Sequence, residues 1–143
     1  MSPDHDNHDA PAAPSESGSS LEEFRQFRER MNAEILGENN LVVNRFFALD
    51  GRAYEAGALD VKTKELLGLV ASLVLRCDDC ITYHVIRCKE EGVTDAEFFE
   101  TFNVGLIVGG SIVIPHLRRA VDMLDRLNAG ESPETAGHAE HGA

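Results

Sequence analysis

The chain has 143 residues, of which 43% are hydrophobic, and its 25 acidic and 13 basic residues give a formal net charge of −12 at pH 7. This length suits a single domain, and the lack of a basic face argues against binding to nucleic acid. The longest apolar runs, at 66–75 and 104–114, are shorter than the roughly 20 residues of a membrane span. The N-terminus lacks the pattern of a secretory signal. We therefore expect a cytoplasmic protein that binds neither membrane nor nucleic acid.

The two ends of the chain differ in composition from its middle. Residues 1–20 and 129–143 are rich in Ser, Pro, Ala and Gly and contain acidic side chains but no lysine or arginine. Such segments cannot bury enough apolar surface to fold. We predict two disordered tails around one folded domain at residues 21–128.

The first predicted element is an amphipathic helix at residues 21–36. Its apolar residues recur every three or four positions, serines precede it and Gly37 can end it. The next segment, at 41–57, is less regular. We expect a short helix there that breaks near Asp50 and Gly51 and resumes through Tyr54.

Three further helices follow in the predicted order. Asp60 opens a segment that is apolar on most sides, so other helices or another subunit must surround it. A helix from about Asp78 to Glu91 comes next, with Gly92 as its stop. Thr94 and Glu97 match a capping box for a helix that extends to Gly109.

The last predicted helix is opened by Ser111, and Pro115 is tolerated only in or near its first turn. No alternation typical of strands is found along the chain. The sequence therefore predicts an all-α fold.

The chemistry of the chain is concentrated in a C-x-x-C pair, Cys77 and Cys80, followed four residues later by His84. Two thiols at this spacing close a disulfide readily, and a cysteine at a helix start has its thiolate favoured by the dipole. Asp78 and Asp79 act in the opposite direction, because a carboxylate disfavours a second negative charge nearby. All three cysteines lie within twelve residues, which is not the pattern of a disulfide-stapled secreted domain.

A helix through the motif would place Cys80, His84 and Cys88 on one face. If Cys80 attacks a peroxide it becomes a sulfenic acid, and Cys77 can condense with it to a disulfide while water leaves. His84 is the candidate general acid–base. Glu65, on the preceding helix, could reach the imidazole, fix its tautomer and complete a proton relay.

The spacing of these residues matches a known family. A glutamate, a C-x-x-C pair that begins twelve residues later and a histidine four residues after the second cysteine resemble the AhpD-like alkylhydroperoxidases of the carboxymuconolactone decarboxylase superfamily. Lys64-Glu65-Leu66 before the cysteines, the segment 92–97 after them and Gly109-Gly110 before the last helix also look like that superfamily. The resemblance covers roughly residues 21–127.

The resemblance implies an AhpD-like helical fold that assembles into a homo-oligomer, a trimer or a hexamer. It implies a peroxiredoxin-like oxidoreductase that reduces hydrogen peroxide or organic hydroperoxides with electrons from a lipoyl-type dithiol or a thioredoxin-like protein. In family terms Cys80 would be the peroxidatic cysteine. Cys77 would be its disulfide partner and the thiol more open to the reductant, and Glu65 and His84 would form the relay. Asp79 departs from the family, whose best-characterised members carry a histidine there.

Three alternatives remain at this level. Cys77, Cys80, His84 and Cys88 could form a Cys₃His zinc site, although zinc usually draws its ligands from two elements. The thiols could instead serve a non-enzymatic helical module that senses redox state. A decarboxylase of the same superfamily is the third, but those enzymes generally lack the cysteine pair. We favour the peroxidase, with no metal or cofactor, and interpret Cys88 as a packed apolar residue.

Overall fold

The computed structural model of the chain describes residues 20–131, in which all regular structure is helical. The elements are α1 (Ser20–Gly37), α2 (Leu41–Ala53), α3 (Val61–Leu75), α4 (Asp78–Glu90), α5 (Asp95–Gly109), a 3₁₀ turn η1 (Ser111–Val113) and α6 (Ile114–Asn128). The all-α prediction is confirmed. The predicted tails lie outside the described residues except for Ser20, which begins α1, and residues 129–131.

The helix ends follow the capping chemistry of the sequence. Asp60 caps α3, since its carboxylate accepts a hydrogen bond from the Thr63 N–H at 2.7 Å. Thr94 and Glu97 form a reciprocal capping box, with bonds of 3.2 and 2.8 Å between each side chain and the other's backbone N–H. Pro115 lies in the first turn of α6, where no helical partner is needed for its missing N–H.

The predicted interruption of the second helix is wrong. Helix α2 runs without a break through Asp50 and Gly51 to Ala53. A glycine inside a helix costs only about 1 kcal/mol relative to alanine, and Asn40 secures the other end by accepting hydrogen bonds from two N–H groups. The continuous helix places Tyr54 at its C-cap.

The core lies between α3, α4, α5 and α6. Helix α3 packs against both α4 and α5, and α4 packs against α6. The fully buried side chains come from all four helices and include Leu69, Leu73, Val85, Phe98, Phe102 and Leu124. This bundle holds α3 and α4 in a fixed relation, which matters because Glu65 and the cysteine pair lie on them.

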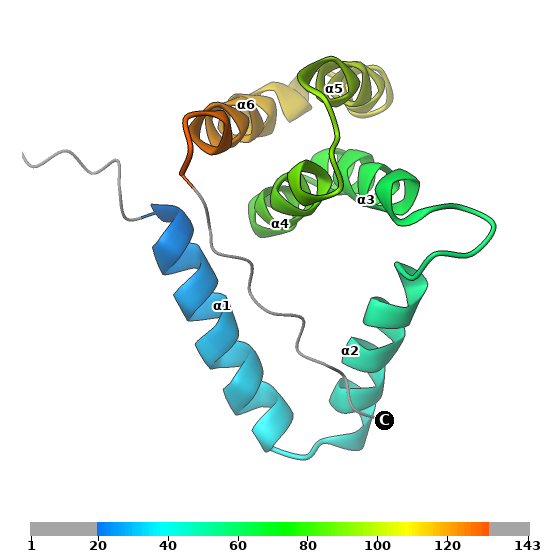
Figure 1. Cartoon of the computed structure of the whole chain (residues 1–143), viewed down its shortest axis with the longest axis vertical. Helices are drawn as coiled ribbons and strands as arrows, with labels where there is room; N and C mark the ends of the chain where they lie inside the picture. Colours follow the sequence, from blue (N-terminus) through cyan, green and yellow to red (C-terminus); the bar gives the residue numbers. More distant parts are fainter. Residues whose placement is uncertain (1–19, 132–143) are drawn as a thin grey trace, which may run out of the picture.

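Helices α1 and α2 lie apart from this bundle. Figure 1 shows them as the two arms of a V that meet at residues 38–40 and run back toward the other helices. Helix α2 contributes no buried residue. None of the described helices is long and apolar enough to cross a membrane.

Candidate active site at the start of α4

The two cysteines of the C-x-x-C motif lie at the first turn of α4. Cys77 is the N-cap residue, and a disulfide joins it to Cys80 across a Cα–Cα distance of 5.2 Å. The Cys77 sulfur also accepts a hydrogen bond from the backbone N–H of Cys80 at 3.3 Å. Unpaired N–H groups and the helix dipole favour negative charge at this position. After reduction, the same geometry would stabilise a thiolate.

The exposure of the two cysteines is the reverse of what the family resemblance implied. Cys80 is exposed and Cys77 is half-buried. The N-cap position explains the difference, because the Cys77 sulfur folds back over its own helical turn. In the single chain the more exposed residue of the pair is thus Cys80, and the reductant's access to Cys77 stays a prediction.

His84 and Glu65 form the buried part of the site. The Glu65 carboxylate, 1% exposed, lies 2.8 Å from Nδ1 of His84. A carboxylate only accepts hydrogen bonds, so Nδ1 carries the proton and Nε2 of the neutral imidazole is left as an acceptor. The structure thus brings together the two residues that the sequence paired across nineteen positions.

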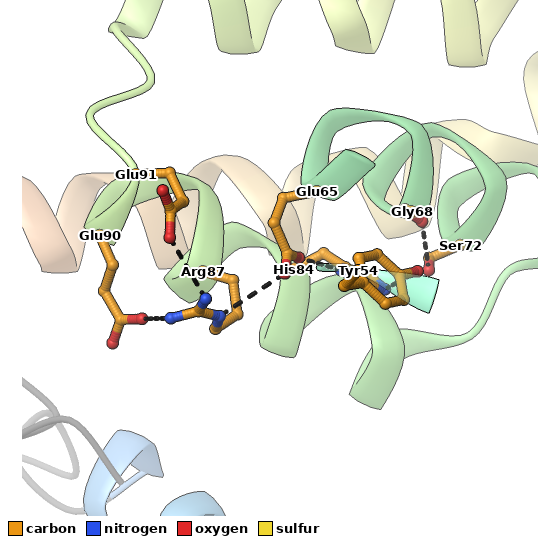
Figure 2. Close-up of polar contacts among 8 residues, drawn as sticks. All are labelled: Tyr54, Glu65, Gly68, Ser72, His84, Arg87, Glu90 and Glu91. Atoms are coloured by element: carbon orange, nitrogen blue, oxygen red, sulfur yellow. Dashed lines mark hydrogen bonds and ion pairs between the residues drawn. The ribbon is translucent and has the colours of Figure 1, made fainter. Parts of the chain in front are cut away.

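Arg87 completes the surroundings of the buried carboxylate. Its Nε lies 3.6 Å from the second oxygen of Glu65, and its guanidinium also pairs with Glu90 and Glu91. Figure 2 shows Arg87 between these two acidic side chains and the Glu65–His84 pair. A buried charge needs such partners, since desolvation alone would cost several kcal/mol.

Tyr54 and Gly68 shape the other side of the imidazole. The Tyr54 hydroxyl lies 3.4 Å from Nε2 of His84, and burial, with Glu65 nearby, raises the pKa of Tyr54, so that the hydroxyl stays protonated. Gly68 lies close to both side chains, and Figure 2 shows its carbonyl oxygen accepting the hydrogen bond of the Ser72 hydroxyl. A Cβ at that position would lie 2.5 Å from Cε1 of His84 and 2.6 Å from the Tyr54 oxygen. Only glycine allows this approach.

A pocket of about 320 Å³ lies between α1 and the start of α4. From the site it is lined by Cys80, His84, Tyr54, Tyr83 and Asp79, and from the arms by Phe24, Phe27, Arg28, Met31, Asn32 and Asp50. The Arg28 guanidinium stacks over the Tyr83 ring at 3.9 Å. Cys80 and His84 thus face one solvent-accessible space whose α1 wall is largely apolar.

The third cysteine is separate from this chemistry. Cys88 is fully buried in the core and unpaired. Burial, together with the charge of Glu65, raises its pKa to about 12, which keeps it a neutral thiol. Residues 20–131 contain no group of three or more His, Cys, Asp or Glu side chains placed to hold a metal ion, so the Cys₃His arrangement does not form in this geometry.

Three residues of the site were missed by the sequence reasoning. Arg87 follows His84 by three positions, a spacing that places both on one side of the helix. Gly68 interrupts an apolar helix at a cost that implies close packing. Tyr54 carried no signal, because its contact with His84 spans thirty positions and depends on how α2 approaches the bundle.

The fold and the site together define an all-α protein with a thiol–disulfide centre at a helix N-terminus. The chain belongs to the carboxymuconolactone decarboxylase family, whose sequence model matches residues 41–123. The matched range begins with α2, ends within α6 and includes Glu65, both cysteines of the pair and His84.

Several known proteins are similar to this chain in structure or in sequence. Two crystal structures from Thermotoga maritima are 55% and 54% identical, with TM-scores of 0.75 and 0.72; each comparison covers 77% of this chain, and 96% and 97% of the respective relatives. A role in the antioxidative response has been suggested for that family protein. A family protein from Legionella pneumophila is 25% identical, with a TM-score of 0.65 over 78% of this chain and 97% of its own. Uncharacterised protein 4 of the cox locus in Paracoccus denitrificans is 30% identical over 83 residues, which are 58% of this chain and 75% of that protein.

Proposed function

We propose that the protein is a thiol-dependent peroxidase of the peroxiredoxin type that reduces hydrogen peroxide or organic hydroperoxides. One observation carries the proposal: the disulfide-forming Cys80 and the imidazole of His84 line the same pocket, and a buried carboxylate supports that imidazole. The antioxidative role suggested for the Thermotoga relative points the same way.

The proposed cycle begins with the reduced pair. The Cys80 thiolate attacks one oxygen of the hydroperoxide, the O–O bond breaks, and an alcohol or water leaves after it takes up a proton. Cys80 is now a sulfenic acid. The Cys77 thiol attacks its sulfur, the S–OH bond breaks with release of water, and the disulfide forms.

His84 moves the protons in this proposal. Glu65 holds the proton on Nδ1, so Nε2 can accept the proton of the Cys80 thiol and return it to the leaving oxygen. The negative charge of Glu65 stabilises the imidazolium in between. Tyr54 donates its hydroxyl hydrogen to Nε2 in the resting state and releases that nitrogen when it takes up the Cys80 proton.

The disulfide must be reduced for another turnover. A dithiol of the lipoyl type or a thioredoxin-like protein would donate two electrons and two protons by thiol–disulfide exchange. The exposure of Cys80 makes it the sulfur that such a donor reaches first in a single chain. The need for a thiol donor fits the reducing conditions of the cytoplasm.

We also propose that the working form is a homo-oligomer, a trimer or a hexamer. Large apolar side chains are exposed on α2 and on α5, among them Val42 at 77%, Phe46 at 70% and Ile107 at 87%. Burial of these side chains against other copies would remove apolar surface from water. Packing of α2 against a second copy would also fix Tyr54 beside His84. Sedimentation of wild type and Phe46→Asp tests the idea, which predicts a smaller species for the variant.

The activity itself is tested by steady-state hydroperoxide consumption with dihydrolipoamide as the donor. We expect many turnovers for wild type and none for Cys80→Ser, because the attacking sulfur is gone. Cys77→Ser should lose the disulfide cycle as well. The matched control Cys88→Ser replaces a cysteine that lies outside the proposed cycle.

Two outcomes would overturn the proposal. If Cys80→Ser keeps full activity, the wrong sulfur has been assigned. If wild type is oxidised once per chain and consumes no more peroxide in excess dithiol, the protein is a redox sensor and not a peroxidase.

A further inference from the structure

The carboxylate of Asp78, the residue directly after Cys77, is hydrogen-bonded by two side chains of α6. Its Oδ1 lies 2.7 Å from Nδ1 of His116, and its Oδ2 accepts a hydrogen bond from Arg119 at 2.9 Å. Each oxygen of this carboxylate therefore bonds one basic side chain, and both of these side chains lie about forty positions further along the chain.

The neighbouring carboxylate, that of Asp79, lies in different surroundings. Asp79 is exposed, faces the pocket with Cys80 and makes no ion pair within residues 20–131. Of the two acidic residues between the cysteines, only the one adjacent to Cys77 is compensated. The contrast indicates a specific contact and not a general attraction between acidic and basic surfaces.

An ionised carboxylate beside Cys77 disfavours a thiolate there. His116 and Arg119 supply hydrogen bonds and positive charge to that carboxylate, so they offset its effect. His116 is largely enclosed, with 17% of its side chain exposed, and donates from Nδ1 whether it is neutral or charged. The contact also ties the first turn of α4 to α6.

We propose that His116 and Arg119 are positioning residues of the redox pair, which act through Asp78 to stabilise the reduced, thiolate form of Cys77 over the disulfide. This inference rests on the proposed thiol–disulfide function of the site. A disulfide whose reduced form is stabilised is a stronger oxidant, so the contact would make the Cys77–Cys80 bond easier to reduce.

The surrounding charges limit which groups can be responsible. The ionisable side chains around the motif include Arg76 in the preceding turn, Asp79 and Tyr83 on α4, the Glu65–His84 pair, Arg28 on α1, Asp50 and Tyr54 beside the pocket, and His116 and Arg119 on α6. Among the residues that the structure describes, only His116 and Arg119 pair with the Asp78 carboxylate.

The test measures the equilibrium of the Cys77–Cys80 disulfide with dithiothreitol. In that exchange dithiothreitol gives up two electrons and two protons and closes its own disulfide, and the protein disulfide opens to two thiols. The readout needs no peroxide, so it can succeed or fail independently of the peroxidase activity.

We expect the double variant His116→Ala, Arg119→Gln to shift the equilibrium toward the disulfide by about two- to fivefold, the range of a partly exposed ion pair. In a Cys80→Ser background the same changes should raise the pH at which Cys77 is alkylated. The matched control Arg118→Gln removes a neighbouring charge on α6 that makes no contact with Asp78, and should stay near wild type. His116→Asn keeps a hydrogen-bond donor close to the Nδ1 position. In place of His116→Ala in the double variant, it should give a smaller shift toward the disulfide.

Asp78→Asn separates the proposed effect from a merely structural one. Without the carboxylate there is nothing to compensate, so Asp78→Asn alone should be at least as reducible as wild type. Adding His116→Ala and Arg119→Gln to it should then change nothing. The proposal is overturned if the double variant matches Arg118→Gln, or if its effect is equally large in the Asp78→Asn background.

Discussion

The first turn of α4 and its last turns both carry cysteine, but they surround the sulfur differently. Cys80 is exposed at the dipole-favoured end and opens into a pocket. Cys88 is buried in the core beside Leu and Phe side chains, and its pKa is raised to about 12. Placement within one helix, and not residue type, decides which sulfur can take part in redox chemistry.

His84 lies between these two cysteines along α4 and has contacts both in the interior and at the pocket. Its Nδ1 is fixed by Glu65 in the dry interior, and its ring lines the pocket beside Cys80. In the proposed relay, a buried carboxylate thus acts on an exposed sulfur through a single side chain. Four variants test the separate roles of the buried residues and the exposed sulfur, from the largest expected loss of turnover to the smallest.

Glu65→Gln should have the largest effect on turnover. The amide still accepts the hydrogen bond from His84, but it cannot stabilise an imidazolium and leaves Arg87 without its buried partner. We expect hydroperoxide turnover to fall about a hundredfold, the lower range for a general acid–base group. Glu97→Gln is the matched control. It removes a carboxylate that accepts a hydrogen bond from Lys62 at 2.8 Å and is not among the residues of the site. Similar losses in both variants would refute the relay.

Gly68→Ala should come next. The added methyl group would lie 2.5 Å from Cε1 of His84, so the imidazole or Tyr54 must move. We expect about tenfold lower turnover and about 1–3 kcal/mol lower unfolding free energy, as for other overpacked sites. Gly37→Ala, with no heavy atom within 4 Å, is the control, and denaturation together with turnover separates the two effects. Unchanged turnover in Gly68→Ala would contradict the close approach.

Tyr54→Phe should have a smaller effect. It removes a hydroxyl that lies 3.4 Å from His84, and we expect a loss of about fivefold, equivalent to one ordinary hydrogen bond. Because the pKa of Tyr54 is raised above its ordinary value of 10.0, the pH profiles of wild type and variant should run parallel below that pH. A new ionisation at lower pH in wild type alone would speak against a protonated hydroxyl.

Cys88→Ala should have the smallest effect on turnover, within about twofold of wild type, since the thiol only packs. Its distinguishing effect is on the pH dependence of the unfolding free energy. The raised pKa means that the unfolded chain loses this proton first, so the contribution of Cys88 is constant below pH 9.0 and declines between pH 9.0 and about 12. The difference in unfolding free energy between wild type and Cys88→Ala should fall by about 1.4 kcal/mol per pH unit in that window. Rapid alkylation of Cys88 in the folded protein at neutral pH would contradict its burial.

Much of the fold could be predicted from the chain because its signals are local. Asp60 and the Thr94–Glu97 pair mark helix starts through hydrogen bonds to residues three positions away. Gly51 misled the prediction, since a single glycine weakens a helix without ending it when the cap and the neighbouring turns hold.

The candidate site could be predicted only where spacing on adjacent helices carries information. Glu65 and His84 could be paired because the helices before and after the cysteine motif must pack together, and the structure places them in contact. The contacts of Tyr54 with His84 and of His116 with Asp78 span thirty or more positions. They follow from how α2 and α6 approach α4, which no local pattern encodes.

The central claim is that Cys80 is the sulfur that attacks the hydroperoxide, and trapping its first product tests this directly. Reduced Cys77→Ser protein, treated with one equivalent of hydrogen peroxide and then digested for mass spectrometry, cannot close the disulfide. The account predicts one added oxygen on Cys80 and none on Cys88. An unmodified Cys80, or equal oxidation of Cys77 in the matched Cys80→Ser protein, would contradict it.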